Sequence, residues 1–191
     1  MVDAFPKHYQ RLFDMMGGLS LEYPIRTVLE LGCNVGHFVG FLRGQGFQAE
    51  GIDGGRLPFR NDLAEYLHEG QLTDLRKVFG DRTFDLIVGQ GVACYGSQFD
   101  YKFGNRPDVG WIVALSALDS KVKAAVGGMV QNNIESILES SFHQLTSGGL
   151  FVICENIDSH DRIDFSRETA QRLGYQVLKY ENQEAVLQKP K

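Results

Sequence analysis

The chain has 191 residues, of which 43% are hydrophobic and 23% are charged, and its formal net charge is -5. This length and composition are typical of one soluble globular domain with its own core. Proteins that bind nucleic acid mainly through phosphates carry a basic face, and this acidic chain has no block of Lys and Arg. Residues 1–191 are therefore predicted to form a single domain that does not bind nucleic acid.

The three cysteines, Cys33, Cys94 and Cys154, are isolated in the sequence. Their spacing argues against a disulfide framework and against a zinc site, and it favours a role as small apolar core residues. The N-terminus lacks the apolar core of a signal peptide, and no run reaches the ~20 apolar residues of a membrane span. We therefore expect a cytoplasmic protein without a membrane partner.

The first predicted element is an N-terminal packing helix. Its apolar residues recur at helical spacing: Phe5, Tyr9, Leu12, Phe13 and Met16. The pair Gly17-Gly18 is the predicted stop signal of this helix. We expect residues 1–24 to form a helical lid.

The next segment reads as a strand, a glycine turn, a helix and a second strand. "TVLEL" (27–31) is a short apolar run, "GHFVGFLRGQG" (36–46) has helical spacing, and "FQAEGID" (47–53) is strand-like. Two strands joined through a helix are predicted to be parallel and to have a right-handed crossover.

The remaining elements continue the alternation. A helix is predicted over 57–67, a short third strand over 66–72, and a strong fourth strand over 83–92. An amphipathic helix over 132–145 is followed by a turn and a fifth buried strand within 146–156. After a helix that ends at Gly174, two strands form an antiparallel hairpin through a turn at 181–183. The predicted fold is α/β: a Rossmann-like, seven-stranded, mostly parallel sheet with an antiparallel last strand and helices on both faces.

The glycine turn at 32–36 excludes two common ligand classes. A dinucleotide fingerprint needs glycines at 32, 34 and 37, but Asn34 and His37 occupy two of these positions. A phosphate loop needs Gly-Lys-Ser/Thr, which the sequence lacks. Tyr175 and Lys179 have the spacing of a dehydrogenase pair but lie in a predicted strand, where i and i+4 do not meet as on a helix. These features disfavour a nicotinamide-dependent oxidoreductase.

The stretch "ELGCNVG" (30–36) resembles the first motif of the class I S-adenosylmethionine-dependent methyltransferases. "GID" ending at Asp53, "HEGQLTDL" (68–75) and "TFDLIVGQGV" (83–92) are similar to the motifs that follow in that family. "LTSGGLFVICEN" (145–156) and "LGYQVL…AVLQKP" resemble its last parallel strand and terminal hairpin. The resemblance covers most of residues 27–92 and 133–190, and it implies S-adenosyl-L-methionine as the cofactor.

The resemblance also implies roles for individual residues. The turn would hold the methionine end of the cofactor, with Glu30 near the ammonium and Asp53 accepting from the ribose hydroxyls. Gln71 stands where the family usually has an Asp that accepts from the adenine amino group, and Leu72 would cover the adenine face. The complete set of predicted cofactor-binding residues is Glu30, Gly32, Cys33, Asn34, Gly36, Asp53, Gln71, Leu72 and Gln90.

Structural alternatives remain open for several of these residues. Glu30 is also suited to capping the helix that follows the turn, and Asp53 is also suited to a simple turn. Gly36 and Gly40 have the spacing of close helix-to-strand packing positions.

Residues 93–132 are longer than a plain crossover needs, which is typical of functional loops. We expect this insert to form an acceptor lid with the N-terminal helix and to present Tyr95, Tyr101 and Trp111 to the substrate. The alternative is a surface excursion with one small apolar cluster. The stretch 114–130 has partly helical character and is suited to a lid or to a homodimer face.

His160 is the best candidate for a general base, because it lies in the loop after the fifth strand between Asp158 and Asp161. These acids would orient the imidazole or, as a weaker alternative, hold a divalent metal; we predict no metal. The other alternative is an exposed loop histidine. We expect a methyltransferase with a small-molecule acceptor such as a sugar or a secondary metabolite. A non-catalytic, methyltransferase-like binding or scaffold protein is the second hypothesis.

Overall fold

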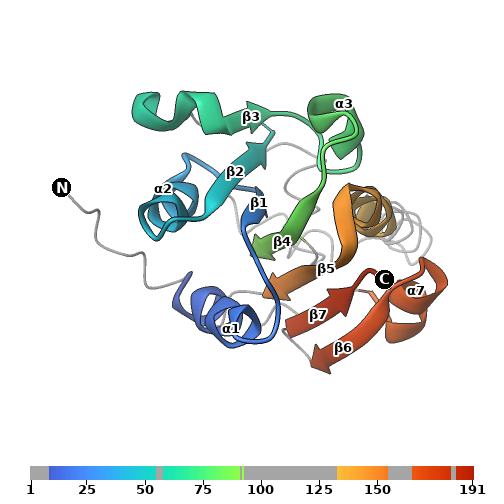
Figure 1. The fold of residues 1–191 in the computed structure, drawn as a ribbon. Coiled ribbons are helices and arrows are strands. Elements are labelled where there is room, and N and C mark those ends of the chain that lie inside the picture. The colour runs from blue at the N-terminus through green and yellow to red at the C-terminus, as the bar shows by residue number, and fades with distance from the viewer. Residues whose placement is uncertain (1–8, 55–57, 91, 93–132, 155–164, 182–183) are drawn as a thin grey trace, which may run out of the picture.

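The computed structural model describes residues 9–54, 58–90, 92, 133–154, 165–181 and 184–191. These residues form one twisted sheet with helices on both faces (Figure 1). The strands are β1 (Thr27–Leu31), β2 (Gln48–Asp53), β3 (Leu67–Glu69), β4 (Phe84–Gln90), β5 (Leu145–Cys154), β6 (Gln176–Glu181) and β7 (Glu184–Gln188). The helices are α1 (Gln10–Ser20), α2 (His37–Gly44), the 3-10 helix η2 (Asn61–Tyr66), α3 (Leu75–Phe79), a helix over 133–144, and α7 (Arg167–Arg172).

The strand order is β3-β2-β1-β4-β5-β7-β6. The pairs from β3 through to β5 are parallel, whereas β7 is antiparallel to both of its neighbours. The predicted fold class is therefore confirmed, including the antiparallel last strand. The direction in which successive strands are added reverses between β1 and β4. The chain places β2 and β3 on one side of β1 and then crosses to the other side of β1 to form β4.

Each face of the sheet carries its own apolar core. On one face α1 and α2 cover Val28, Val88 and Val152, and on the other face α3, the helix over 133–144 and α7 cover Leu29, Ile87 and Phe151. Neighbouring residues on one strand alternate between the two cores, as the period of two in a strand requires. The near-continuous apolar strands that the sequence shows thus reflect burial on both faces.

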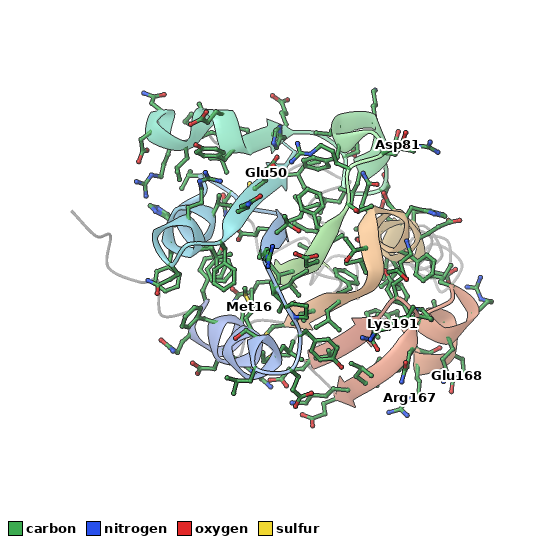
Figure 2. The ribbon with its side chains drawn as sticks, viewed as in Figure 1. Met16, Glu50, Asp81, Arg167, Glu168 and Lys191 are labelled. Atoms are coloured by element: carbon green, nitrogen blue, oxygen red, sulfur yellow. The ribbon has the colours of Figure 1, made fainter. Side chains whose placement is uncertain are left out.

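The N-terminal helix differs from its prediction. It does not stop at Gly17-Gly18 but continues to Ser20. Its buried residues Leu12 and Met16 pack on the sheet, and Met16 points inward in Figure 2. Arg11 near its start forms an ion pair with the buried Glu184 of β7.

Two other predicted elements also differ. The helix expected over 57–67 is only the six-residue 3-10 helix η2. The turn expected after 145 lies inside β5, where the partner of β4 shifts from Leu145 opposite Phe84 to Leu150 opposite Leu86. Residues 146–149 therefore form an irregular segment within a longer strand.

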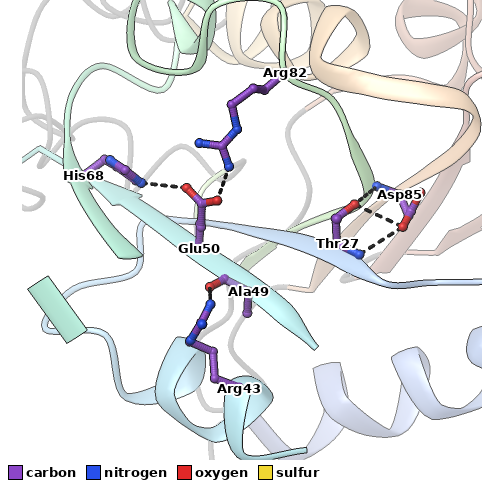
Figure 3. A network of polar contacts seen from close by, with 7 residues as sticks. All are labelled: Thr27, Arg43, Ala49, Glu50, His68, Arg82 and Asp85. Carbon is purple, nitrogen blue, oxygen red and sulfur yellow. Dashed lines mark hydrogen bonds and ion pairs between the residues drawn. The ribbon is translucent and has the colours of Figure 1, made fainter. Parts of the chain in front are cut away.

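Polar contacts fix the strands on the side of the sheet that carries α3. Glu50 of β2 bonds to His68 at 2.8 Å and pairs with Arg82, and Asp85 contacts Thr27 (Figure 3). In the described part of the chain, no helix has the length and apolar character that a membrane span requires.

Candidate cofactor site

The turn between β1 and α2 contains several residues with left-handed backbone conformations. Gly32, Asn34 and Gly36 have φ values of 70°, 55° and 94°. The N–H groups of Gly32 and Cys33 donate to the Ile52 carbonyl of β2 at 2.8 and 3.2 Å. The turn is therefore attached to the end of β2 as well as to β1.

Close packing, as well as the left-handed backbone conformation, favours glycine at position 36. It is the N-cap of α2, and a Cβ at this position would lie 2.5 Å from Cδ1 of Leu67 in β3. A Cβ on Gly40 would lie 3.0 Å from Cδ1 of Leu63. The close helix-to-strand packing is thus confirmed for Gly36, whereas the neighbour of Gly40 lies in η2 and not in a strand. The packing of Gly36 is compatible with a ligand on the other side of the turn.

Asp53 ends β2 beside the turn. Its Oδ2 accepts from the Asn34 N–H at 3.2 Å, and its carbonyl accepts from the Gly70 N–H at 2.9 Å. The carboxylate is only partly buried. Asp53 thus joins the turn, β2 and the segment after β3 at one edge of the sheet.

Glu30 lies inside the protein, on the sheet face that α1 and α2 cover. Its side chain is 2% exposed, and the polar groups near it include the Tyr9 hydroxyl and the Val39 backbone of α2. The N-cap of α2 is Gly36, and the helix-capping alternative for Glu30 stays a prediction. Oε2 of Glu30 has no hydrogen-bond partner among the described residues.

Burial controls the ionisation of Glu30. Loss of solvation raises the pKa of this carboxyl to about 8, and the nearby charge of Asp53 adds to the rise. The polar groups of Tyr9 and of the Val39 backbone oppose the rise in pKa, because they favour the charged form. A cation placed near Oε2 would therefore convert a largely protonated acid into its carboxylate.

Cys33 turns its side chain away from the mouth of the turn. The thiol is fully buried, and a Cβ on Gly51 would lie 2.7 Å from its sulfur. Its N–H is bonded to Ile52, its carbonyl accepts from Gly36 at 2.9 Å, and burial raises the pKa of the thiol. Cys33 therefore contributes to the site by shaping the turn and not through its thiol.

The segment after β3 lies at the same edge as Asp53. Gln71 is exposed, and Leu72 is buried against the core that contains Leu31 and Ile52. Since Gly70 bonds to Asp53, the structure brings Gln71 and Leu72 to the carboxyl end of β2.

Gln90 is half-buried at the end of β4, opposite Cys154. Two residues later, the side chain of Val92 lies over the turn. A Cβ on Gly32 would be 3.0 Å from its Cγ1, and a Cβ on Gly89 would be 2.4 Å from its Cγ2. Glycine at both positions makes room for Val92 between β1 and β4.

Several predicted residues lie outside the described part of the chain: Tyr95, Tyr101, Trp111 and His160, the insert 93–132 and the dimer-face stretch 114–130. Their roles stay predictions, as does the lid role of residues 1–24. Within the described ranges, no group of three His, Cys, Asp or Glu side chains is placed to hold a metal ion.

Tyr9 was not among the predicted site residues. Its place in the helical pattern of the N-terminus indicated a core residue, and it is indeed 7% exposed. No local sequence signal joins it to Glu30, which lies 21 positions further along the chain. Only the packing of α1 on the sheet brings the two together.

No protein-family profile matches the sequence, and no curated protein matches it either. The fold is nevertheless shared with solved methyltransferases. A T. thermophilus 16S rRNA methyltransferase, solved in complex with AdoMet and guanosine, is 12% identical with a TM-score of 0.57, and the match covers 99% of this chain and 44% of that one.

Two further structures are similar. An O-methyltransferase family protein from Burkholderia thailandensis is 14% identical with a TM-score of 0.55, covering 95% of this chain and 56% of that one. An S-adenosylmethionine-dependent methyltransferase from Clostridium acetobutylicum is 11% identical with a TM-score of 0.58, covering 98% and 93%. The chain therefore spans about half the length of the first two and nearly all of the third.

The chain has the fold of the class I S-adenosylmethionine-dependent methyltransferases.

Proposed function

We propose that this protein is an S-adenosylmethionine-dependent methyltransferase. The observation that carries the proposal is the pairing of a buried carboxyl, Glu30, with a second carboxylate, Asp53, around one left-handed glycine turn. The turn lies where the strand order reverses, and ligands of open α/β sheets bind at this point beyond the carboxyl ends of the strands.

The residues present suit the parts of this cofactor. Oε2 of Glu30 lacks a partner among the described residues and is available to an ammonium group, directly or through water. The Asp53 carboxylate is suited to two ribose hydroxyls. The start of α2 favours a carboxylate, because free N–H groups and the helix dipole converge there.

The adenine end would lie against the segment after β3. Leu72 offers an apolar surface, and the exposed Gln71 offers an amide oxygen for the adenine amino group. Gln90 would border both the cofactor and the acceptor.

The bound cofactor would supply an electrophilic methyl group on a sulfonium. The protein's part in such a displacement is to hold the acceptor in line and to exclude water. A general base is needed only for an acceptor that holds its proton tightly, such as an alcohol, and His160 is our candidate in that case.

We further propose that the acceptor is a small molecule. The net charge of -5 and the lack of a basic block disfavour a nucleic-acid acceptor. One similar structure is nonetheless an rRNA methyltransferase, so RNA belongs among the tested acceptors.

The test is a thermal-shift comparison with S-adenosylmethionine, S-adenosylhomocysteine, NAD and NADP. Because a ligand that binds only the folded state raises its stability, we expect a rise in Tm with the first two ligands alone. A rise with NAD or NADP alone, or no rise with any of the four, would overturn the proposal. Transfer of a radiolabelled methyl group to panels of small molecules and RNA then tests the acceptor class.

One observation favours the alternative of a non-catalytic protein. Val92 packs against Gly32 and Gly89, where the crevice beside β1 and β4 would otherwise admit a ligand. If Val92 blocks the site, Val92→Ala should create cofactor binding that the wild type lacks. Equal binding by both proteins would exclude this alternative.

A further inference from the structure

Helix α1 contacts α2 through two pairs of aromatic rings. The ring of Tyr9, the N-cap residue of α1, stacks on Phe38, with ring centroids 4.6 Å apart and an interplanar angle of 3°. The ring of Phe13 meets Phe41 edge-on, with centroids 5.0 Å apart and an interplanar angle of 82°. These contacts join α1 to the first two turns of α2, the helix that follows the glycine turn.

On another side, α1 contacts the hairpin of β6 and β7. Nε of Arg11 donates to Oε1 of Glu184, the first residue of β7, whose side chain is buried. Oε2 of Glu184 pairs with Nζ of Lys179 in β6. Each oxygen of one buried carboxylate therefore has one cationic partner, an arrangement that is costly to break from either side.

Glu184 lies at the edge of the sheet where ligands of such folds bind. It is the register partner of Cys154 at the end of β5, and Cys154 is the partner of Gln90 at the end of β4. The carboxyl ends of these parallel strands share one edge with the glycine turn. Helix α1 thus joins the β7 side of this edge to the α2 side, with Leu12 and Met16 buried on the sheet between them (Figure 1).

The two sets of contacts use different sides of α1. Tyr9 and Phe13 are four residues apart and lie on one side of the helix, whereas Arg11 is turned about 200° from each of them. A rotation of α1 about its axis, or a shift along it, would break one set in order to keep the other. The ion pair with Glu184 therefore fixes the orientation in which the aromatic rings meet α2.

We propose that Arg11 is a positioning residue for cofactor binding, which holds α1 against α2 and so fixes the start of α2 beside the glycine turn. The start of α2 follows directly on Gly36, where the proposed function places the cofactor carboxylate, and the inference rests on that function. Arg11 needs no contact with the cofactor to act in this way. The proposal assigns residues 9–20 a fixed place in the site.

The first experiment measures hydrogen exchange of the ligand-free wild type and of Arg11→Gln. Lys179 stays as a partner of Glu184, so we expect the variant to remain folded. Amides of α1 and of α2 should exchange about 2- to 30-fold faster, the range that a packed network transmits, while those of α7 should not change. Arg11→Lys keeps a cation for Glu184 and should restore most of the protection.

The second experiment measures the Kd of S-adenosylhomocysteine by calorimetry, at a temperature where every variant is folded. Arg11→Gln should bind about 2- to 30-fold more weakly, and Arg11→Lys should lie between this variant and the wild type. In Glu184→Gln, the additional change Arg11→Gln should have little effect on Kd, because the two substitutions remove the same ion pair.

The matched control is Arg172→Gln. Nη2 of Arg172 pairs with Oε2 of Glu135 at 2.6 Å, which joins α7 to the helix over 133–144 on the other face of the sheet. This variant makes the same change in charge and also breaks an ion pair between two elements. It should leave Kd and the exchange of α2 within about twofold of the wild type, the spread expected of surface substitutions. The control separates positioning from a general effect of charge or stability.

Either of two results would contradict the inference on exchange alone: faster exchange confined to α1, or equal changes in α2 for Arg172→Gln. An unchanged Kd in Arg11→Gln would contradict it on binding. Failure of the proposed function would instead appear as no binding of S-adenosylhomocysteine by the wild type. The exchange experiment would still decide whether Arg11 holds α1 on α2.

Discussion

The Asp53 carboxylate accepts the backbone N–H of Asn34 at 3.2 Å, so the acidic end of β2 supports the strained centre of the glycine turn. A residue with this contact has a structural role whether or not a ligand binds. Asp53→Asn separates the two roles, because an amide oxygen still accepts from the Asn34 N–H but the amide nitrogen cannot accept from a ribose hydroxyl.

We expect Asp53→Asn to weaken S-adenosylhomocysteine binding by about 10- to 100-fold, the effect of losing one hydrogen bond to a charged group. The unfolding free energy should change by less than about 0.5 kcal/mol. Calorimetry and urea unfolding measure the two quantities. Asp81→Asn makes the same charge change at an exposed ion pair with Arg76 and should leave affinity unchanged. A variant that loses both affinity and stability would mean that the contact with the turn is the main role of Asp53.

Glycine substitutions at two positions should have opposite effects on stability. A Cβ on Gly51 would lie 2.6 Å from Cβ of Cys33 and 2.9 Å from Cγ2 of Val39, so Gly51→Ala should destabilise by about 1–3 kcal/mol. A Cβ on Gly17 meets nothing within 4 Å and lies within α1, so Gly17→Ala should stabilise by about 0.5–1 kcal/mol. Urea unfolding of both variants tests the pair. A destabilised Gly17→Ala would show that α1 needs a flexible residue there.

The same helix shows what the sequence could not predict. Gly17-Gly18 is a valid stop signal on local grounds, since glycine costs about 1 kcal/mol in a helix interior. The burial of Leu12 and Met16 and the partial burial of Leu19 on the sheet offset that cost, and this burial depends on tertiary structure. Local signals were sufficient for β1 and β4, whose apolar runs need no distant partner to be recognised.

The candidate site likewise has residues that local sequence signals predict and contacts that depend on tertiary structure. The left-handed turn was predictable because Gly32 and Gly36 mark it in the sequence, and Asp53 follows from its place at the end of a strand. The surroundings of Glu30 were not, because they include Tyr9, which lies in a segment that precedes the whole sheet.

Thr27 and Asp85 join β1 to β4 by reciprocal hydrogen bonds (Figure 3). Oδ2 of Asp85 accepts from the N–H groups of Arg26 and Thr27 at 2.9 Å each and from Oγ1 of Thr27 at 3.0 Å. Oγ1 of Thr27 in turn accepts from the Asp85 N–H at 2.9 Å. These contacts lie at the starts of the two strands, away from the glycine turn.

Asp85→Ala should destabilise by about 1–3 kcal/mol, because it leaves several partly buried donors without their acceptor. Thr27→Val should show a coupling energy with it of about 0.5–3 kcal/mol in a double-mutant cycle, whereas Thr27→Ser keeps the hydroxyl and should stay near the wild type. Cofactor affinity should not change in any of these variants. Additive effects of Thr27→Val and Asp85→Ala would contradict the reciprocal contact.

The buried Glu30 should make stability depend on pH. Its pKa is raised from 4.5 to about 8 on folding, so between these values the folded state binds more protons than the unfolded state. Stability from this group is therefore fully present below about pH 4.5 and is lost as the pH rises through about 8. Each pH unit inside the window contributes up to about 1.4 kcal/mol.

Glu30→Gln removes the titration and keeps the size and shape of the side chain. We expect the variant to approach the wild type in unfolding free energy near pH 5 and to exceed it at pH 8–9, in urea unfolding without ligand. S-adenosylhomocysteine should reverse this order at pH 8, because only the carboxylate can pair with its ammonium. Parallel pH curves for the two proteins would mean that Glu30 is ionised in the folded protein throughout, with a cation near it that the described residues do not supply.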